Sequence, residues 1–370
     1  MKYLPLFSID LNYLFIPIGM SFYSFRNISY LIDVYRGTIR SYNNFVIYVN
    51  YSLFFPSFSS GPIDRANDLI PQLSYRTQYD DKMIFSGLLQ FMWGLFKKIV
   101  VAAHMNVYTN WIFGDIFSYS GGTLVFASVL YSIQLYCDFS GYSDMAIGIA
   151  KMFGIRIHRN FENPYFATSV TDFWHRWHIS LSTWLRDYVF IPLGGNRCSK
   201  KRMYCNIFIT FLISGIWHGV TINYLIWGAL HGIISIFEKI MIKKKHLSFY
   251  LIRMLITFII VNFLWVIFRL QCMDEIIYFF MHMMDGIIYP FDYIKKIHLT
   301  LNIDFLLFIK LLLISLVVFT FEKANEKKNF FDEISGKTRM IRILVCASFG
   351  YIMFMLLPVN SAVDYIYFRF

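Results

Sequence analysis

Residues 205–242 read CNIFITFLISGIWHGVTINYLIWGALHGIISIFEKIMI, and this stretch decides the fold class of the chain. Among its residues only Glu238 and Lys239, close to its end, are acidic or basic apart from histidine. A membrane-spanning helix needs about 20 apolar residues to cross roughly 30 Å of hydrocarbon. We therefore expect two spans here, at residues 205–222 and 223–242, and an integral membrane protein.

Apolar segments of similar length recur along nearly the whole chain. Of its 370 residues, 57% are hydrophobic and only 15% are charged, whereas a soluble domain carries about 25% charged residues. No linker rich in Pro, Gly or Ser separates the segments. The sequence predicts an all-α, multi-spanning helical bundle in the cell membrane. We expect its further spans at residues 11–30, 42–60, 84–104, 121–137, 250–270, 303–321 and 341–358.

Positive charge is concentrated in short connections between these segments. The net charge is +11, from 34 Lys and Arg against 23 Asp and Glu. The basic residues gather at Lys97-Lys98, at 197–202, at 243–245 and at 323–342. This distribution is typical of cytoplasmic loops, where Lys and Arg set the orientation of a membrane protein. No basic stripe alternates with aromatic residues outside the spans, which argues against nucleic-acid binding.

The cysteines give no sign of a disulfide framework or a metal site. There are five of them, with no C-x-x-C pair and no metal-ligand spacing. An odd number without such spacing indicates neither a disulfide scaffold nor bound zinc. His175 and His178 are three apart, a spacing that leaves a metal pair as a remote alternative.

Polar residues interrupt the apolar pattern between residues 138 and 192. A charged group at membrane depth costs at least about 2.5 kcal/mol, so it is kept where it is paired or lines a wet cavity. We predict broken or re-entrant helices inside the bundle, around a central tunnel; an amphipathic helix on the cytoplasmic surface is the alternative. The interrupting residues are Asp138, Asp144, Arg156, Asp172, Arg176, His178, Arg186 and Asp187.

Within this region, residues 171–187 read TDFWHRWHISLSTWLRD and have helical spacing. Ser169 or Thr171 is a suitable N-cap. Asp172 and Arg176 are four apart and can pair on one helix face. His178 and Ser182 have the same spacing. A helix with polar and aromatic side chains on all faces is expected to be surrounded by protein.

The segment SGIWHG at Ser214–Gly219 places His218 inside an apolar span. The neighbouring glycines allow a substrate or another backbone to approach closely. Imidazole can accept and donate a proton near neutral pH, which makes His218 a candidate general base for a hydroxyl nucleophile. A histidine that serves only packing or hydrogen bonding is the alternative.

Taken together, these motifs resemble the membrane-bound O-acyltransferase family, and within it the bacterial branch that acetylates alginate. The similarity covers most of residues 17–232. The matching blocks are PIGMSFYSFRNISYLIDVYRG at Pro17–Gly37, GPIDR at Gly61–Arg65, PQL at Pro71–Leu73, DFSGYSDMAIGIAKMFGI at Asp138–Ile155, NFENPYFATSVTDFWHRWHISLSTWLRDYVFIPLGGNR at Asn160–Arg197 and SGIWHGVTINYLIWGALHG at Ser214–Gly232.

The resemblance implies an O-acyltransferase, most simply an O-acetyltransferase that uses acetyl-CoA or another acyl thioester from the cytoplasm. The acceptor would be a hydroxyl of an extracellular or cell-wall polysaccharide, and a periplasmic or extracellular acetyltransferase partner is expected. By motif, His218 would be the principal base and His178 would assist. His175 stands where relatives usually carry Arg. The residues expected to bind the donor are Trp177, Arg186, Asp187 and Arg197.

The end of the chain, residues 364–370, reads DYIYFRF. It resembles an F-x-Y-F-x-F ending of bacterial relatives, and by that match Tyr367 would carry the acyl group as an acyl-tyrosyl relay. An aromatic belt at the membrane interface is the alternative. The resemblance also implies a single transmembrane domain over residues 1–370 that lacks N-terminal spans of its relatives.

Two other functions fit parts of the sequence. A transporter would also need broken helices and buried charges, but we detect no inverted repeat. A non-catalytic membrane scaffold for polysaccharide modification would keep its function without His218.

Overall fold

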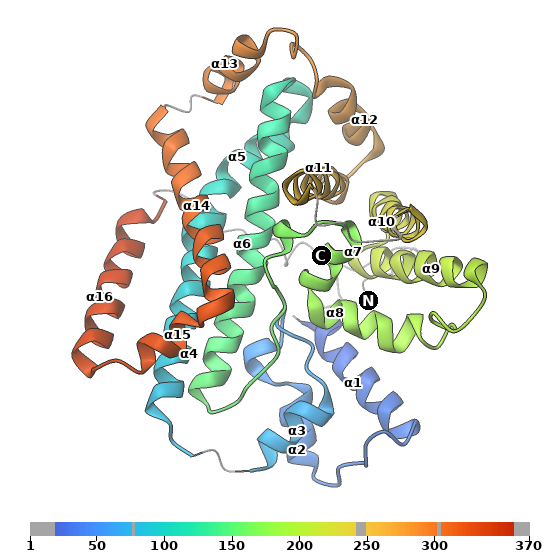
Figure 1. Ribbon diagram of the computed structural model, residues 1–370, viewed down its shortest axis with the longest axis vertical. Helices are drawn as coiled ribbons and strands as arrows, with labels where there is room; N and C mark the ends of the chain where they lie inside the picture. Colours follow the sequence, from blue (N-terminus) through green and yellow to red (C-terminus); the bar gives the residue numbers. More distant parts are fainter. Residues whose placement is uncertain (1–18, 76–77, 242–248, 302–304, 359–370) are drawn as a thin grey trace, which may run out of the picture.

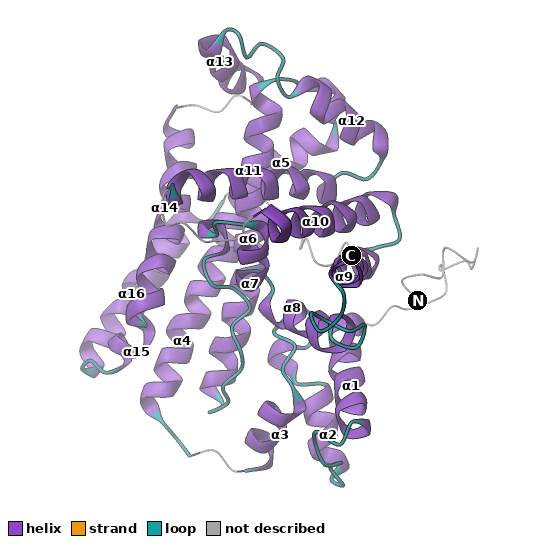
Figure 2. Cartoon of the chain, turned by 45° about the vertical axis from the view of Figure 1, so that its right-hand side comes forward, coloured by secondary structure: helices purple, strands orange, loops and turns teal. Residues whose placement is uncertain are grey.

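All regular structure in the computed structural model is helical. The structure describes residues 19–75, 78–241, 249–301 and 305–358, and within these ranges it has no strand (Figure 2). In the described part of the chain, five helices are long and apolar enough to cross a membrane, which agrees with the predicted multi-spanning bundle. They cover Asp81–Gly114, Gly122–Met152, Ile222–Met241, Tyr250–Arg269 and Arg339–Leu356.

The N-terminal part of the described chain forms short helices at the lower end of the molecule (Figure 1). They are α1 (Met20–Tyr35), α2 (Phe45–Ser52) and α3 (Ala66–Ser74). The span expected at residues 42–60 is wrong, because α2 ends at Ser52 and a 3-10 turn containing Pro56 follows. Proline has no N–H to continue a helical ladder, so it favours a break at this point.

Two long helices form the centre of the bundle. The first consists of α4 (Asp81–Phe96), the π-helical segment η3 (Lys97–Ala102) and α5 (Ala103–Gly114). The second is α6 (Gly122–Met152), which packs along α4 for most of its length.

Glycine pairs bring these two helices close together. Gly87 faces Gly148, and Gly94 faces Gly141. A Cβ atom at Gly87 would lie 2.5 Å from the carbonyl oxygen of Gly148, closer than any real contact. Small residues at such crossings let helix backbones approach within a membrane.

The polar interruption expected from residue 138 begins later than predicted. Helix α6 continues unbroken to Met152 and carries Asp138 and Asp144 within it. The expected position of Lys97 and Lys98 in a cytoplasmic connection is also wrong, because both lie buried in η3. The helices stay intact because these charges pair: Lys98 binds Asp138, and Lys97 binds Asp144.

A third helix joins this ionic network. Glu322 of α14 (Phe305–Lys328) lies 2.6 Å from the ammonium group of Lys97, which also lies 2.6 Å from Asp144. Tyr136 donates a hydrogen bond to the same glutamate. One buried cation of η3 therefore connects this segment with α6 and α14.

Residues 153–199 contain the broken helices that the sequence predicts. They include η5 (Pro164–Phe166), α7 (Val170–Arg176), α8 (Ile179–Leu185) and η6 (Arg186–Phe190). The predicted cap at Ser169 is confirmed, since its side chain accepts from the N–H of Asp172.

The predicted pair of Asp172 and Arg176 is confirmed too, at 3.0 Å. The single helix expected over residues 171–187 is wrong. Its ladder breaks between Arg176 and Ile179, where Trp177 is extended and His178 adopts a left-handed conformation.

The remaining helices complete the bundle around α6. Helices α9 (Lys200–His218) and α10 (Ile222–Met241) pack against each other, and α10 also packs against α11 (Tyr250–Arg269). The spans predicted at residues 223–242 and 250–270 therefore correspond to membrane-spanning candidates, whereas α9, at the span predicted for residues 205–222, is a helix that is not among those candidates. The other elements are α12 (Met273–His282), α13 (Pro290–Leu301), α15 (Phe330–Ser335) and α16 (Arg339–Leu356).

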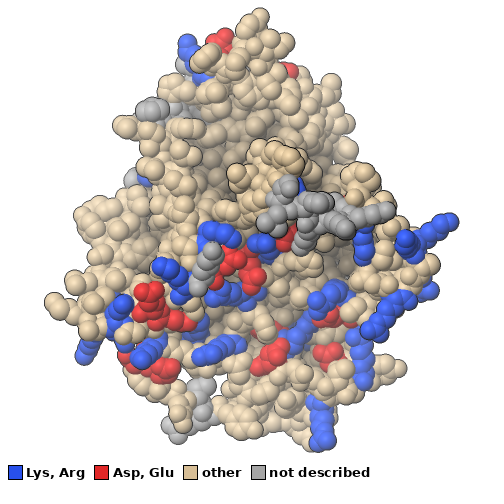
Figure 3. All heavy atoms as spheres, in the orientation of Figure 1, with Lys and Arg blue, Asp and Glu red and all other residues tan. Residues whose placement is uncertain are grey.

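Charged side chains gather at one end of the molecule. Figure 3 shows most Lys, Arg, Asp and Glu over the lower half of the visible face, and few over the upper part, where α12 and α13 lie. The lower end includes the basic residues 337–342 that precede and begin α16. By the positive-inside pattern, we expect this end to face the cytoplasm.

Replacing Lys97 by alanine is expected to destabilise the folded protein strongly. Lys97 is 1% exposed, and its removal leaves the partly buried carboxylates of Asp144 and Glu322 without their cation. Breaking such a buried pair costs about 3–5 kcal/mol. The loss of stability is measured as a lower midpoint of thermal unfolding of the detergent-solubilised protein. Lys82→Ala, at the exposed start of the same helix, is the matched control; equal midpoints for the two variants would contradict the prediction.

Candidate functional site

His218 lies at the end of α9, where the chain turns sharply into α10. It is 8% exposed. A side chain at Gly219 would collide with the ring of Tyr224, so a residue without a Cβ is needed for the turn. The turn brings the imidazole from a helix end into the interior.

Aromatic rings surround His218. The ring centroids of Trp217, Trp227 and Phe268 lie 4.6, 5.3 and 4.9 Å from the centroid of its imidazole. They belong to three different helices, α9, α10 and α11. The imidazole therefore sits where the three helices meet, in a water-poor environment that strengthens electrostatic interactions.

His178 occupies the break between α7 and α8. Its backbone has φ +45°, in the left-handed region that residues with a side chain rarely adopt. The ring is 1% exposed and lies edge-on to Phe139, with centroids 4.6 Å apart. Among the described residues, neither ring nitrogen has a hydrogen-bond partner. Buried polar groups normally have partners, so this imidazole is suited to bind a substrate group.

The structure brings the two predicted histidines to the same indole. Trp217 lies 4.6 Å from His218 and 6.2 Å from His178, measured between ring centroids. The residues are far apart in sequence, yet they flank one side chain. His178 and His218 thus lie on either side of Trp217, and we call these three residues the histidine cluster.

A third buried histidine lies nearby, to which the sequence reasoning gave no role. His231 of α10 is fully buried, and its Nδ1 accepts a hydrogen bond of 3.1 Å from the indole N–H of Trp174. Since that indole can only donate, the proton of the neutral ring is on Nε2. Its signal in the sequence was the HG pair at 231–232, which repeats the HG pair at 218–219.

A cavity of about 350 Å³ opens between the α7–α8 segment and the α9–α10 pair. Its buried wall includes Ser214 and Ser235, whereas Arg186 and Lys239 are exposed at its edge. The wall is mostly apolar and the edge carries two cations. Such a cavity fits a ligand with an apolar arm and an anionic end.

The other residues expected to bind the donor lie in different surroundings. Asp187 accepts from Arg186 at 2.8 Å and from Arg65 at 3.4 Å. Arg197 is exposed in the turn after η6. Trp177 is 3% exposed and packs 5.0 Å from Trp265 in the aromatic core, so it does not line this cavity. Tyr367 lies outside the described residues.

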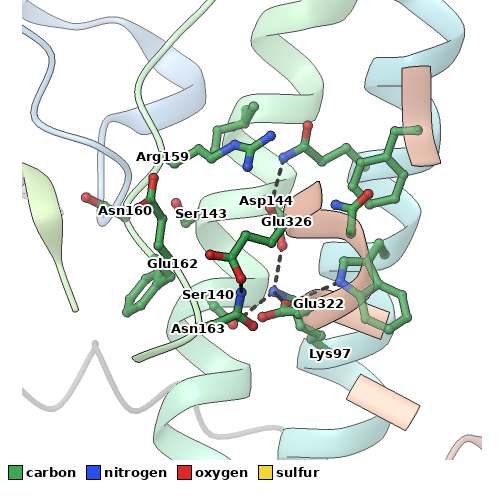
Figure 4. Close-up of a pocket in the computed structure, with 16 residues that line it drawn as sticks. Lys97, Ser140, Ser143, Asp144, Arg159, Asn160, Glu162, Asn163, Glu322 and Glu326 are labelled. Atoms are coloured by element: carbon green, nitrogen blue, oxygen red, sulfur yellow. Dashed lines mark hydrogen bonds and ion pairs between the residues drawn. The ribbon is translucent and has the colours of Figure 1, made fainter. Parts of the chain in front are cut away.

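A second cavity, of about 190 Å³, is polar (Figure 4). The network of Lys97, Asp144 and Glu322 forms one wall, and residues 159–163 cross the other. Sequence reasoning identified Asp144 as a polar interruption but missed Lys97 and Glu322. The position of Lys97 inside the predicted span 84–104 was a sign that it needs a buried partner. Nothing in the sequence identified Glu322 of α14 as that partner.

Asn160 connects this second cavity to the histidine cluster. It lines the cavity and is fully buried. Its backbone oxygen accepts from the N–H of Ile179 at 3.0 Å, and its side-chain oxygen accepts from the N–H of Ser180 at 3.2 Å. These bonds satisfy the first N–H groups of α8 and hold the corner at His178.

Residues 37–277 match the model of MBOAT, the membrane-bound O-acyltransferase family. The match covers more than half of the chain, and the chain belongs to this family. It is a multi-pass membrane protein.

Individual relatives share different parts of this similarity. The chain is 45% identical over 260 residues to the probable alginate O-acetylase of Pseudomonas syringae pv. tomato, covering 70% of this chain and 50% of the relative. It is 36% identical over 293 residues to the peptidoglycan O-acetyltransferase of Helicobacter pylori, covering 71% and 56%. Identity to the teichoic acid D-alanyltransferase of Bacillus subtilis is 30% over 252 residues, covering 62% of each. The chain thus spans about half the length of the first of these relatives.

The left-handed backbone at His178 predicts a difference between two substitutions. Both His178→Gly and His178→Ala remove the imidazole, but only glycine adopts φ +45° without strain. The glycine variant is expected to unfold with a free energy about 1 kcal/mol higher than that of the alanine variant. Denaturant unfolding in detergent measures the difference. A more stable alanine variant would contradict the left-handed corner.

Proposed function

We propose that this chain is an O-acyltransferase that moves an acetyl group from a cytoplasmic thioester, such as acetyl-CoA, to a hydroxyl of an extracellular or cell-wall polysaccharide. The proposal rests above all on the cluster in which His178 and His218 flank Trp217. Family membership supports acyl transfer as the reaction class, and the names of the relatives favour a glycan acceptor.

In the proposed reaction, His218 acts as the general base. Its imidazole takes the proton of the acceptor hydroxyl, and the oxygen attacks the thioester carbonyl carbon. A C–O bond forms and the C–S bond breaks, and the proton passes from His218 to the leaving thiolate. General-base catalysis of this kind contributes typically 10²–10⁴-fold to a rate. His178, with two ring nitrogens that have no described partner, orients the thioester or the acceptor.

The donor is proposed to enter through the cavity between α7–α8 and α9–α10. Its acyl-pantetheine arm fits the apolar wall near Ser214. Its phosphate groups would meet Arg186 and Lys239 at the exposed edge, since guanidinium and ammonium groups bind phosphate by charge-assisted hydrogen bonds. Asp187 and Arg65 would hold Arg186 in place through their own contacts.

In a relay form of the same reaction, Tyr367 takes the place of the glycan hydroxyl as the nucleophile that attacks the thioester. The phenolic oxygen would attack the thioester after His218 removes its proton, giving an ester that passes its acyl group to the glycan or to an extracellular acetyltransferase partner. This step rests on the resemblance of residues 364–370 alone.

His218→Ala is expected to abolish acylation of the extracellular glycan. The measurement is the acyl content of glycans from cells that express the wild type or the variant at equal levels. His282→Ala, a partly exposed histidine of α12, is the matched control and should leave acylation unchanged. Normal acylation with His218→Ala would overturn the enzymatic proposal and favour a scaffold. Loss with Tyr367→Phe as well would support the relay.

Arg186→Ala is expected to raise the KM for acetyl-CoA by roughly tenfold, because one charge-assisted contact to phosphate is lost. The KM for acetyl-pantetheine, which lacks the nucleotide phosphates, should stay the same. Steady-state kinetics with membranes that contain the protein measure both. Lys200→Ala, an exposed cation at the start of α9, is the control. An equal change for both donors would exclude phosphate recognition by Arg186.

A further inference from the structure

A third cavity lies at the end of the molecule opposite the basic loops. It has a volume of about 330 Å³ and lies where α5 and α11 end. From Gly114 to Gly122, and from Leu270 to Tyr289, the sequence has no Lys or Arg. Helix α13 at the same end carries Lys295 and Lys296, but the basic loops lie at the opposite end, so by the positive-inside pattern we expect this end to face outward. The cavity is lined by Asn110, Phe113, Gly114, Arg269, Leu270, Gln271 and Glu275.

Arg269 is the cation of this outer cavity. Its side chain is half-buried, and its Nη2 donates a hydrogen bond of 3.0 Å to the side-chain oxygen of Asn110. Among the described residues, no carboxylate lies within 4.0 Å of its guanidinium nitrogens. Most of the five guanidinium N–H groups are therefore available for an anion.

A chain of amide side chains holds Arg269 in its orientation. Asn110, which accepts from Arg269, donates to Asn106 at 3.0 Å. Gln134 of α6 donates to the same oxygen of Asn106 at 2.8 Å, and it accepts from Thr109 at 2.6 Å. Three of these residues are buried, so the chain is fixed by packing. A binding group held in this way loses little entropy when a ligand arrives.

Two aromatic rings flank the guanidinium. The carbon at its centre lies 5.8 Å from the ring centroid of Phe113 and 5.9 Å from that of Tyr131. These contacts stabilise the positive charge without neutralising it. Phe113 also lines the cavity and offers an apolar surface beside the cation.

The outer cavity adjoins the histidine cluster. Phe268, the neighbour of Arg269 in sequence, packs its ring 4.9 Å from the imidazole of His218. Asn223 donates a hydrogen bond of 2.7 Å to the carbonyl oxygen of Leu270, which fixes the start of α10 to the end of α11. The end of α11 that carries Arg269 thus also carries one of the rings packed against His218.

We propose that this outer cavity is a subsite for an acidic sugar residue of the acceptor polysaccharide, and that Arg269 binds the sugar carboxylate. The planar guanidinium matches a carboxylate through two parallel hydrogen bonds. Asn110, Gln271 and Glu275 supply polar groups for the sugar hydroxyls, and Phe113 supplies a face for the ring. The inference rests on the proposed function, since it assigns the acceptor of that reaction.

Direct binding tests the subsite without turnover. A fluorescently labelled oligouronate and its carboxyl-reduced counterpart are titrated against the detergent-solubilised full chain carrying His218→Ala. Arg269→Gln in this background is expected to weaken oligouronate binding by roughly 10- to 100-fold, as the loss of a hydrogen bond to a charged group predicts. Binding of the carboxyl-reduced chain should not change.

Two further variants sharpen the test. Asn110→Asp places a carboxylate beside the guanidinium and should weaken oligouronate binding in the same way. The aspartate side chain has the same length as the asparagine that it replaces. Lys295→Gln, an exposed cation of α13 at the same end of the molecule, is the matched control and should have no effect.

Each other outcome overturns the subsite. Equal affinity for the two oligosaccharides, or oligouronate binding that survives Arg269→Gln, would exclude carboxylate recognition by Arg269. Displacement of the probe by phosphatidylglycerol vesicles, but not by unlabelled oligouronate, would assign the cavity to a lipid headgroup. Acylation that persists with His218→Ala would overturn the proposed function alone, because the binding measurement does not depend on turnover.

Discussion

The buried ammonium group of Lys97 is the constraint on which the central bundle depends. In hydrocarbon an unpaired charge is too costly to keep, so the lysine must meet carboxylates wherever the helices place it. It does so with Asp144 of α6 and Glu322 of α14, both at 2.6 Å. The contact lets a charged helix cross the core, and it fixes α14 against two helices more than 170 residues earlier in the chain. The glycine pairs bring α4 and α6 close enough for this pairing.

A second constraint is the left-handed corner at His178. A continuous helix would spread the polar groups of residues 171–187 around one axis, and His178 would lie one turn above Trp174. The break turns the imidazole toward Phe139 instead. Asn160 holds the corner by accepting from two N–H groups of α8. In this way the loop beside the polar cavity of Figure 4 also places one histidine of the cluster.

Local features were predicted well. The cap at Ser169 and the pair of Asp172 with Arg176 depend on residues within one helical turn, and both are present. The predictions failed where distant partners decide. The sequence predicts Lys97 and Lys98 in a cytoplasmic connection because clustered basic residues are typical of such loops, yet carboxylates of other helices hold them inside. Helix α6 passes through Asp138 and Asp144 for the same reason.

The amino-acid sequence by itself determined the membrane class, the approximate positions of most helices and the two histidine motifs. Hydropathy and local spacing are properties of neighbouring residues, so they can be recognised along the chain. Only the tertiary structure decided which charges are paired, that His178 and His218 share Trp217, and that Arg269 lies beside a cavity without a described carboxylate partner. Those outcomes depend on how helices far apart in sequence pack, because only packing determines which buried polar group finds a partner.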